Sequence, residues 1–171
     1  MRIYANPLWI IATGESRFEV PVGELKEEGH IVMGINRVIN ETPLNFWHGQ
    51  DVWAFISDFQ SIRGTGIVAL IPDDAGALLG TVFKYRREMI PALGSGMTGL
   101  FLGASLGFNP IFLVGFDFHQ GGSPRYEGQI HEGVVKFKEK FPDVDVYNTS
   151  KTSKMKQFPY RSFDDCRHGE C

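Results

Sequence analysis

The apolar positions of this chain fall into short runs, and most of these runs end in polar residues. Continuous apolar runs are typical of strands that are buried on both faces of a parallel sheet. We expect strands at residues 8–12, 31–35, 51–56, 67–71 and 144–147, and in the segment that leads to Asp117.

Helical patterns alternate with these runs. Residues 22–28 predict a short helix that a glycine closes, and Pro72 followed by two acids predicts a helix from 72 to about 87. Residues 129–141 alternate basic and apolar side chains at helical spacing, and Ser162 is placed to cap a last helix. This alternation predicts an α/β fold: a single Rossmann-like domain over residues 1–171, with a mainly parallel sheet flanked by helices.

The segment 94–119 carries the strongest functional signal. It begins with the small-residue loop 94–96, continues as a helix rich in glycine and alanine, and turns into an apolar strand that ends at Asp117 and His119. N–H groups in the first turn of a helix bind phosphate, and open α/β sheets bind ligands at the carboxyl ends of their strands. The segment therefore predicts a nucleotide site.

Polar residues also follow the other expected strands. Because the carboxyl ends of parallel strands share one edge of a sheet, we expect these residues to converge in one crevice. The residues predicted to bind the nucleotide are Gly14, Ser16, Asn36, Asp58, Ser95, Gly96, Met97, Asn148 and Ser150. The predicted catalytic residues are His119 and Asp117, since an imidazole transfers protons near neutral pH and a carboxylate at a strand end can serve a ligand.

Residues 121–128 form a glycine-rich segment that we expect to be a mobile loop. Its Arg125 and Tyr126 are suitable phosphate donors if the loop closes as a lid. Structural roles remain as alternatives: the glycines can serve turns and close packing, Asn36 can cap a helix, and Asp117 can pair within the protein. The histidines at 48 and 131 are expected at the surface.

Composition and charge narrow the class of function. A hydrophobic content of 43% and a charged content of 22% are typical of a soluble globular domain. The formal charge of −3 gives no support for non-specific nucleic-acid binding. No apolar run approaches the ~20 residues that cross a membrane, and the N-terminus lacks a signal pattern, so we expect a cytoplasmic protein.

Both cysteines lie in the last six residues, at Cys166 and Cys171, with His168 between them. Structural zinc sites use four ligands at characteristic spacings, and the sequence offers no second half of such a site. We therefore predict a flexible tail and no metal site, with a metal or redox role for this pair as the alternative.

A family resemblance is carried by three blocks, at residues 95–97, 104–108 and 112–119. The segments 13–16, 34–37 and 147–150 occur in the same order as their counterparts in that family. At these residues the chain resembles the bacterial lipooligosaccharide sialyltransferases. It also resembles the broader family of motility-associated-factor flagellin glycosyltransferases and archaeal 6-hydroxymethylpterin diphosphokinases. The resemblance covers most of the chain, and its specific part is the central block.

The resemblance implies a transferase that moves a sugar-type group from a nucleotide-sugar donor to an acceptor, with no cofactor required. It also implies that the Ser-Gly and Gly-x-Asp-Phe segments embrace the nucleotide, that His119 assists the departing phosphate, and that Tyr126 lies nearby. A diphosphokinase would instead transfer pyrophosphate to a pterin-like substrate and use Mg²⁺ to bridge phosphate oxygens. A nucleotide-binding module without catalysis is a third hypothesis.

Overall fold

The computed structural model describes residues 6–49, 60–72, 82–86, 90, 94–117, 124–153 and 155–169, without the side chains of 82–83 and 124–127. The strands are β1 (Leu8–Ile11), β2 (Ile31–Ile35), β3 (Phe46–His48), β4 (Val68–Pro72), β5 (Val82–Tyr85), β6 (Ile111–Val114) and β7 (Val146–Asn148). The α-helices are α2 (Ser95–Ser105), α3 (Pro124–Lys140) and α4 (Phe163–Arg167), and the 3-10 helices are η1 (Glu15–Glu19), η2 (Val22–Glu24) and η3 (Asn36–Asn40).

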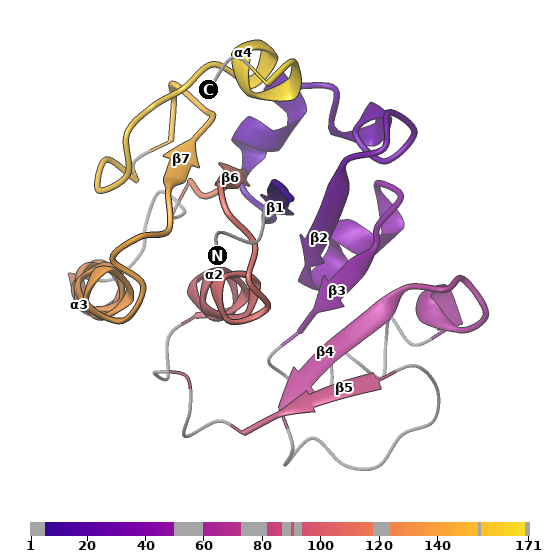
Figure 1. Cartoon of the computed structure of the whole chain (residues 1–171), viewed down its shortest axis with the longest axis horizontal. Coiled ribbons are helices and arrows are strands. Elements are labelled where there is room, and N and C mark those ends of the chain that lie inside the picture. The colour runs from indigo at the N-terminus through magenta and orange to yellow at the C-terminus, as the bar shows by residue number, and fades with distance from the viewer. Residues whose placement is uncertain are drawn as a thin grey trace.

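The seven strands form one sheet in the order β5-β4-β3-β2-β1-β6-β7, and every neighbouring pair is parallel (Figure 1). From β1 the chain moves outward to β5, and it then returns through α2 to form β6 on the other side of β1. The order of strands therefore reverses between β1 and β6, which is where open parallel sheets bind ligands. The Rossmann-like α/β fold expected from the sequence is confirmed.

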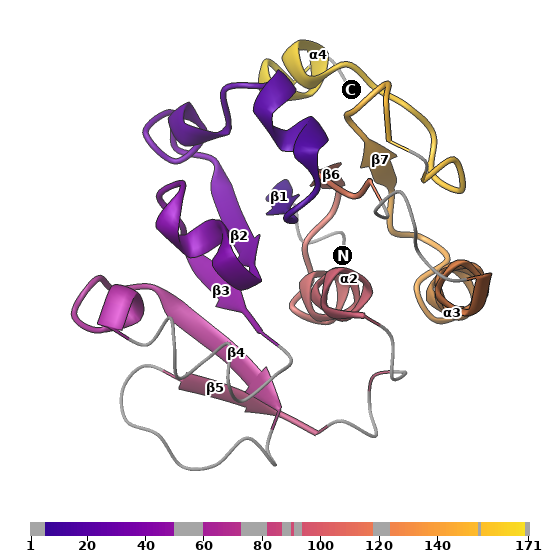
Figure 2. The same cartoon turned by 180° about the vertical axis from the view of Figure 1, so that it is seen from behind.

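Side chains on the strands alternate between two apolar cores, one on each face of the sheet. Leu8 and Ile10 belong to the core under α2 and α3, whereas Trp9 and Ile11 belong to the core that α4 and the residues around the N-terminal 3-10 helices cover. Figures 1 and 2 show these two layers on opposite sides of the strands. Burial on both faces explains why the strand sequences are continuously apolar.

Helix α2 packs closely against the sheet because two of its residues lack side chains. A Cβ added at Gly99 would lie 2.6 Å from the Ile35 Cδ1 atom, and one added at Gly103 would lie 2.6 Å from the Leu8 Cδ2 atom. A larger residue at either position would require the facing Ile35 or Leu8 side chain to move.

One sequence-based element prediction is wrong, and one strand was missed. Residues 82–85 form β5 instead of the end of a helix, because Val82, Phe83 and Tyr85 suit a strand and pair with β4. Strand β3 at residues 46–48 was not expected, and the strand predicted at 51–56 lies outside the described residues.

The remaining differences concern helix boundaries. The helix expected at 22–28 is a 3-10 turn at 22–24 followed by turns that end at Gly29, whose φ is +88°. Helix α3 begins at Pro124, so the loop expected at 121–128 is helical from 124 onward. None of the described helices is both long and apolar enough to cross a membrane.

The C-terminal prediction is correct for the helix and wrong for the tail. Ser162 caps α4 by accepting a hydrogen bond from the Asp165 N–H at 3.1 Å, as its sequence position suggested. Cys166 is buried in α4 and disulfide-bonded, so it does not belong to a flexible tail. Cys171 lies outside the described residues.

Candidate functional site

The carboxyl ends of all seven strands lie at one edge of the sheet, because every strand pair is parallel. Gly14 follows β1, Asn36 follows β2, Asp117 follows β6, and Asn148 ends β7. The convergence expected from the sequence is therefore present for these residues. Asp58 and His119 lie outside the described residues, and so do the side chains of Arg125 and Tyr126 in the first turn of α3.

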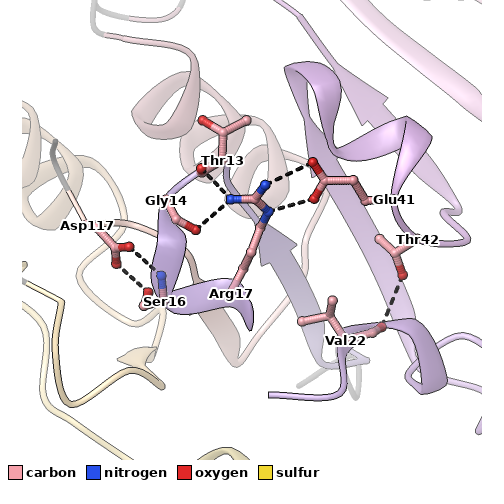
Figure 3. A network of polar contacts seen from close by, with 8 residues as sticks. All are labelled: Thr13, Gly14, Ser16, Arg17, Val22, Glu41, Thr42 and Asp117. Atoms are coloured by element: carbon pink, nitrogen blue, oxygen red, sulfur yellow. Dashed lines mark hydrogen bonds and ion pairs between the residues drawn. The ribbon is translucent and has the colours of Figure 1, made fainter. Parts of the chain in front are cut away.

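Asp117 joins the loop after β1 to the end of β6. Its Oδ2 atom accepts a hydrogen bond from the Ser16 N–H at 2.6 Å, and its Oδ1 atom accepts one from the Ser16 hydroxyl (Figure 3). The Gly14 N–H donates to the Gly115 carbonyl at 2.9 Å. A Cβ at Gly14 would lie 2.6 Å from the Asp117 carboxylate, so only glycine allows this approach. The alternative of a structural partner for Asp117 is thus realised.

Arg17 fixes the same loop from its other side, and sequence analysis missed this residue. Its guanidinium forms two hydrogen bonds with the Glu41 carboxylate, at 2.6 and 2.9 Å, and donates to the carbonyls of Thr13 and Gly14 (Figure 3). Arg17 is buried, and a paired, planar guanidinium suits such a position. The loop at the strand-order reversal is therefore held on both sides by charged groups.

The N-terminus of α2 lies beside the end of β6. A Cβ added at Gly96 would lie 3.0 Å from the Cε1 atom of Phe116, the residue before Asp117. Among the described residues no side chain caps this helix, and the first internal bond runs from the Thr98 N–H to the Gly94 carbonyl. The N–H groups of Ser95, Gly96 and Met97 belong to the first turn, where helix donors lack helix partners and the helix dipole favours an anion.

Asn148 and Ser150 are engaged within the protein at the end of β7. The Asn148 amide donates to the carbonyls of Ser150 and Met155, and its oxygen accepts from the Ser150 N–H, all at 3.2 Å. The Ser150 hydroxyl contacts Thr152 at 3.0 Å and Glu19 at 3.4 Å. These contacts hold the loop after β7, and nucleotide contact by either residue stays a prediction.

Asn36 has a left-handed backbone, and its side-chain oxygen is buried. Its φ is +53°, a left-handed conformation that asparagine adopts more readily than most residues other than glycine. Its carbonyl accepts a hydrogen bond from the Trp47 indole at 2.7 Å, whereas its side-chain Oδ1 atom has no hydrogen-bond partner among the described residues. The Asn36 side chain therefore does not cap a helix, since η3 has no side-chain cap.

His48 ends β3 and is fully buried, so the expectation of a surface position is wrong. Its Nδ1 atom lies 2.9 Å from the Leu70 carbonyl, and within the described part of the chain its Nε2 atom has no hydrogen-bond partner. Burial lowers the pKa of His48 from 6.5 to about 4, although the Leu70 contact opposes that shift. The imidazole is therefore neutral at pH 7. His131 is exposed on α3, as expected.

No group of three or more metal-ligand side chains gathers among the described residues. In the described part of the chain, this edge of the sheet offers helix N–H groups, hydroxyls, amides and carboxylates, and the carboxylates of Asp117 and Glu41 are paired within the protein. That set of groups suits binding of a phosphorylated, hydroxylated ligand.

Comparison with solved structures identifies the fold more closely. The sialyltransferase CstII from Campylobacter jejuni with cytidine-5'-monophosphate superposes with a TM-score of 0.62, at 13% identity over 90% of this chain and 84% of that chain. The chain has the fold of CstII.

Two further sialyltransferase structures agree. CstII with CMP-3FNeuAc gives a TM-score of 0.63 at 14% identity, and covers 92% of this chain and 85% of that chain. CST-II with a trisaccharide acceptor and CMP gives 0.62 at 13% identity, and covers 89% and 84%. No protein-family model and no curated protein matches the sequence. The structural likeness supports a sialyltransferase-like fold, and it gives no support to the other groups of the sequence resemblance.

Proposed function

We propose that this protein is a nucleotide-dependent transferase of the glycosyltransferase type, which moves a sugar-type group from a nucleotide donor to an acceptor. The observation that carries the proposal is the meeting of the β1 loop, the end of β6 and the uncapped start of α2 where the strand order reverses. The likeness to sialyltransferase structures that hold CMP supports the choice of donor class.

In this proposal the first turn of α2 binds the donor phosphate. The N–H groups of residues 95–97 would donate to phosphate oxygens, and the helix dipole would stabilise the negative charge that develops on the leaving group. The close contact of Gly96 with Phe116 leaves little room for a side chain on that side, which suits a loop that a ligand approaches closely.

In this proposal Asp117 positions the β1 loop and does not transfer a proton. Both of its oxygens accept hydrogen bonds from Ser16, so the carboxylate holds the β1 loop against β6. His119, Arg125 and Tyr126 remain the proposed groups for the departing phosphate, with His119 as the proposed proton-transfer residue. We propose that this reaction requires no cofactor.

The test is calorimetric titration with CMP, UDP, GDP and ATP and with their sugar conjugates, including CMP-3FNeuAc, followed by assays of nucleotide release. Gly96→Val should abolish nucleotide binding, because the branched side chain blocks the start of α2 and presses on Phe116. Gly128→Val is the matched control, since a Cβ there on α3 meets nothing within 4 Å. Failure of the wild type to bind any nucleotide would reject the proposal, and binding without turnover would indicate a binding module.

A further inference from the structure

The segment that joins β7 to α4 is basic, although the chain as a whole is acidic. Residues 146–163 contain four cationic side chains, Lys151, Lys154, Lys156 and Arg161, and no Asp or Glu, in a chain whose formal net charge is −3. The side chains of Lys151, Lys156 and Arg161 are exposed. The proposed donor site makes no use of these charges, because it binds phosphate through the N–H groups of α2.

Three lysines and a tyrosine lie close together along this segment. The Lys156 Nζ atom donates to the Lys151 carbonyl at 3.3 Å, and the Lys151 Nζ atom lies 5.7 Å from the centre of the Tyr160 ring. Lys138 joins them from α3, because its Nζ atom donates to the carbonyl of Gln157 at 3.1 Å. Both segments lie at the β7 end of the sheet (Figure 1). We call Lys138, Lys151, Lys156 and Tyr160, all of which are exposed, the β7-loop surface.

The lysines of the β7-loop surface can accommodate an anion. Within the part of the chain that the structure describes, none of the three forms an ion pair with a carboxylate. An ammonium group has three N–H donors, and the carbonyl contacts of Lys138 and Lys156 use one donor each. Donors on both groups therefore remain for a carboxylate or phosphate ligand.

Internal hydrogen bonds hold this loop beside the proposed donor site. The Ser153 hydroxyl donates to the carbonyl of Phe116, the residue before Asp117, at 2.7 Å. The Thr152 hydroxyl donates to the Glu19 carboxylate at 2.7 Å, and Glu19 ends the 3-10 helix that follows the β1 loop. The β7-loop surface is thus tied both to the end of β6 and to the segment after β1, which are the neighbours of the proposed donor.

We propose that the β7-loop surface binds the acceptor of the transfer, and that this acceptor is an acidic glycan. The lysines would bind its carboxylate or phosphate groups, and Tyr160, whose exposed fraction is 43%, would offer an apolar ring face and a hydroxyl to a sugar ring. A small inorganic anion would need the cations alone, whereas an acidic glycan uses the lysines and the tyrosine together. The acceptor role rests on the proposed function, because an acceptor must lie beside the donor.

Three variants separate the β7-loop surface from general charge. The double variant Lys151→Gln/Lys156→Gln removes two exposed cations, and Tyr160→Ser removes the ring. Lys136→Gln is the matched control, since Lys136 is also exposed on α3 but pairs with Glu132. It lies two residues before Lys138, about 200° around the helix, and therefore on another face. Circular dichroism and thermal unfolding check that each variant folds.

The experiment measures affinities for two acidic glycans, hexagalacturonate and a phosphorylated mannopentaose, and for uncharged maltohexaose. The wild type should prefer at least one acidic glycan to maltohexaose by about tenfold or more, and the preferred glycan identifies the anionic group. The double variant should lose roughly tenfold of this affinity, and Tyr160→Ser should lose about threefold. Lys136→Gln should lose less than about twofold. Nucleotide affinity should be unchanged in all three variants.

Four results would overturn the acidic-glycan surface. They are no preference for either acidic glycan over maltohexaose, no loss in the double variant, an equal loss in Lys136→Gln, or tighter binding of single-stranded DNA or of phosphatidylserine vesicles than of the acidic glycans. The proposed function survives these results as long as the wild type binds a nucleotide. Glycan binding by a wild type that binds no nucleotide would instead reject the proposed function and the acceptor role together.

Discussion

Asp117 was predicted from the sequence as a catalytic residue, and in the structure its carboxylate holds Ser16 in place. They are 101 residues apart in sequence, yet both Asp117 oxygens accept hydrogen bonds from Ser16. A sequence pattern marks Asp117 as a polar residue at a strand end, but it does not contain the partner. The choice between a ligand and an internal partner therefore had to come from the three-dimensional contacts.

Asp117→Asn should destabilise the protein by about 1 to 2 kcal/mol, because hydrogen bonds to a charged acceptor are replaced by weaker ones. Ser16→Ala should cost a similar amount, and the double variant should cost less than the sum of the two. Urea unfolding of all three proteins measures this. Asp143→Asn, at an exposed carboxylate, should change stability by less than about 0.5 kcal/mol. Additive effects would contradict the direct Ser16–Asp117 contact.

His48 makes a prediction about pH at the residue scale. Its pKa is about 4 in the folded protein and near 6.5 when unfolded, so the unfolded chain binds more protons between these values. Stability should therefore be fully present above pH 6.5 and should fall by about 3 kcal/mol as the pH drops to 4. Urea unfolding of wild type and His48→Gln at several pH values tests this, since the variant should lose that part of the pH dependence. Identical pH profiles would show that His48 is not buried as a neutral ring.

Helix α2 illustrates, at the element scale, a property that sequence could predict. Its three glycines and Ala104 indicated a buried, closely packed helix, and the structure brings Gly103 against Leu8 on β1. Gly103→Ala should destabilise the protein by about 1 to 3 kcal/mol through overpacking, although alanine is the better helix former. The matched change Gly128→Ala on α3 should stabilise it by up to about 1 kcal/mol. Thermal unfolding compares the two, and stabilisation by both changes would contradict close packing of α2.

Strands β3 and β5 were not predicted from the sequence pattern. Strand β3 has three residues and ends in a histidine, so its apolar run is too short to stand out. Its position depends on Asn45, whose side-chain oxygen accepts a hydrogen bond from the Val32 N–H of β2 at 2.9 Å. In β5 the helix-like signal from Pro72 and its acids overrode the β-branched and aromatic residues at 82–85. By contrast β1, β2 and β4 have uninterrupted apolar runs and were predicted close to their observed bounds.

At the scale of the whole molecule, the parallel sheet assembles a site from segments far apart in sequence. The β1 loop, the start of α2 and the end of β6 meet because the strand order reverses between β1 and β6. This convergence was predictable from strand ends alone, as all parallel strands present their carboxyl ends to one edge. The pairings within the edge, such as Arg17 with Glu41, were not, because no local pattern encodes which distant charges meet.

The central claim is that a nucleotide phosphate binds at the first turn of α2, beside the β1 loop and the end of β6. Amide chemical shifts during nucleotide titration test it most directly, because each N–H reports on its own contacts. The largest changes should occur at Ser95, Gly96 and Met97, with smaller ones at Gly14 and Ser16, and Gly128 on α3 should not move. Saturable nucleotide binding that leaves the amides of residues 95–97 unchanged and shifts signals elsewhere would contradict the account.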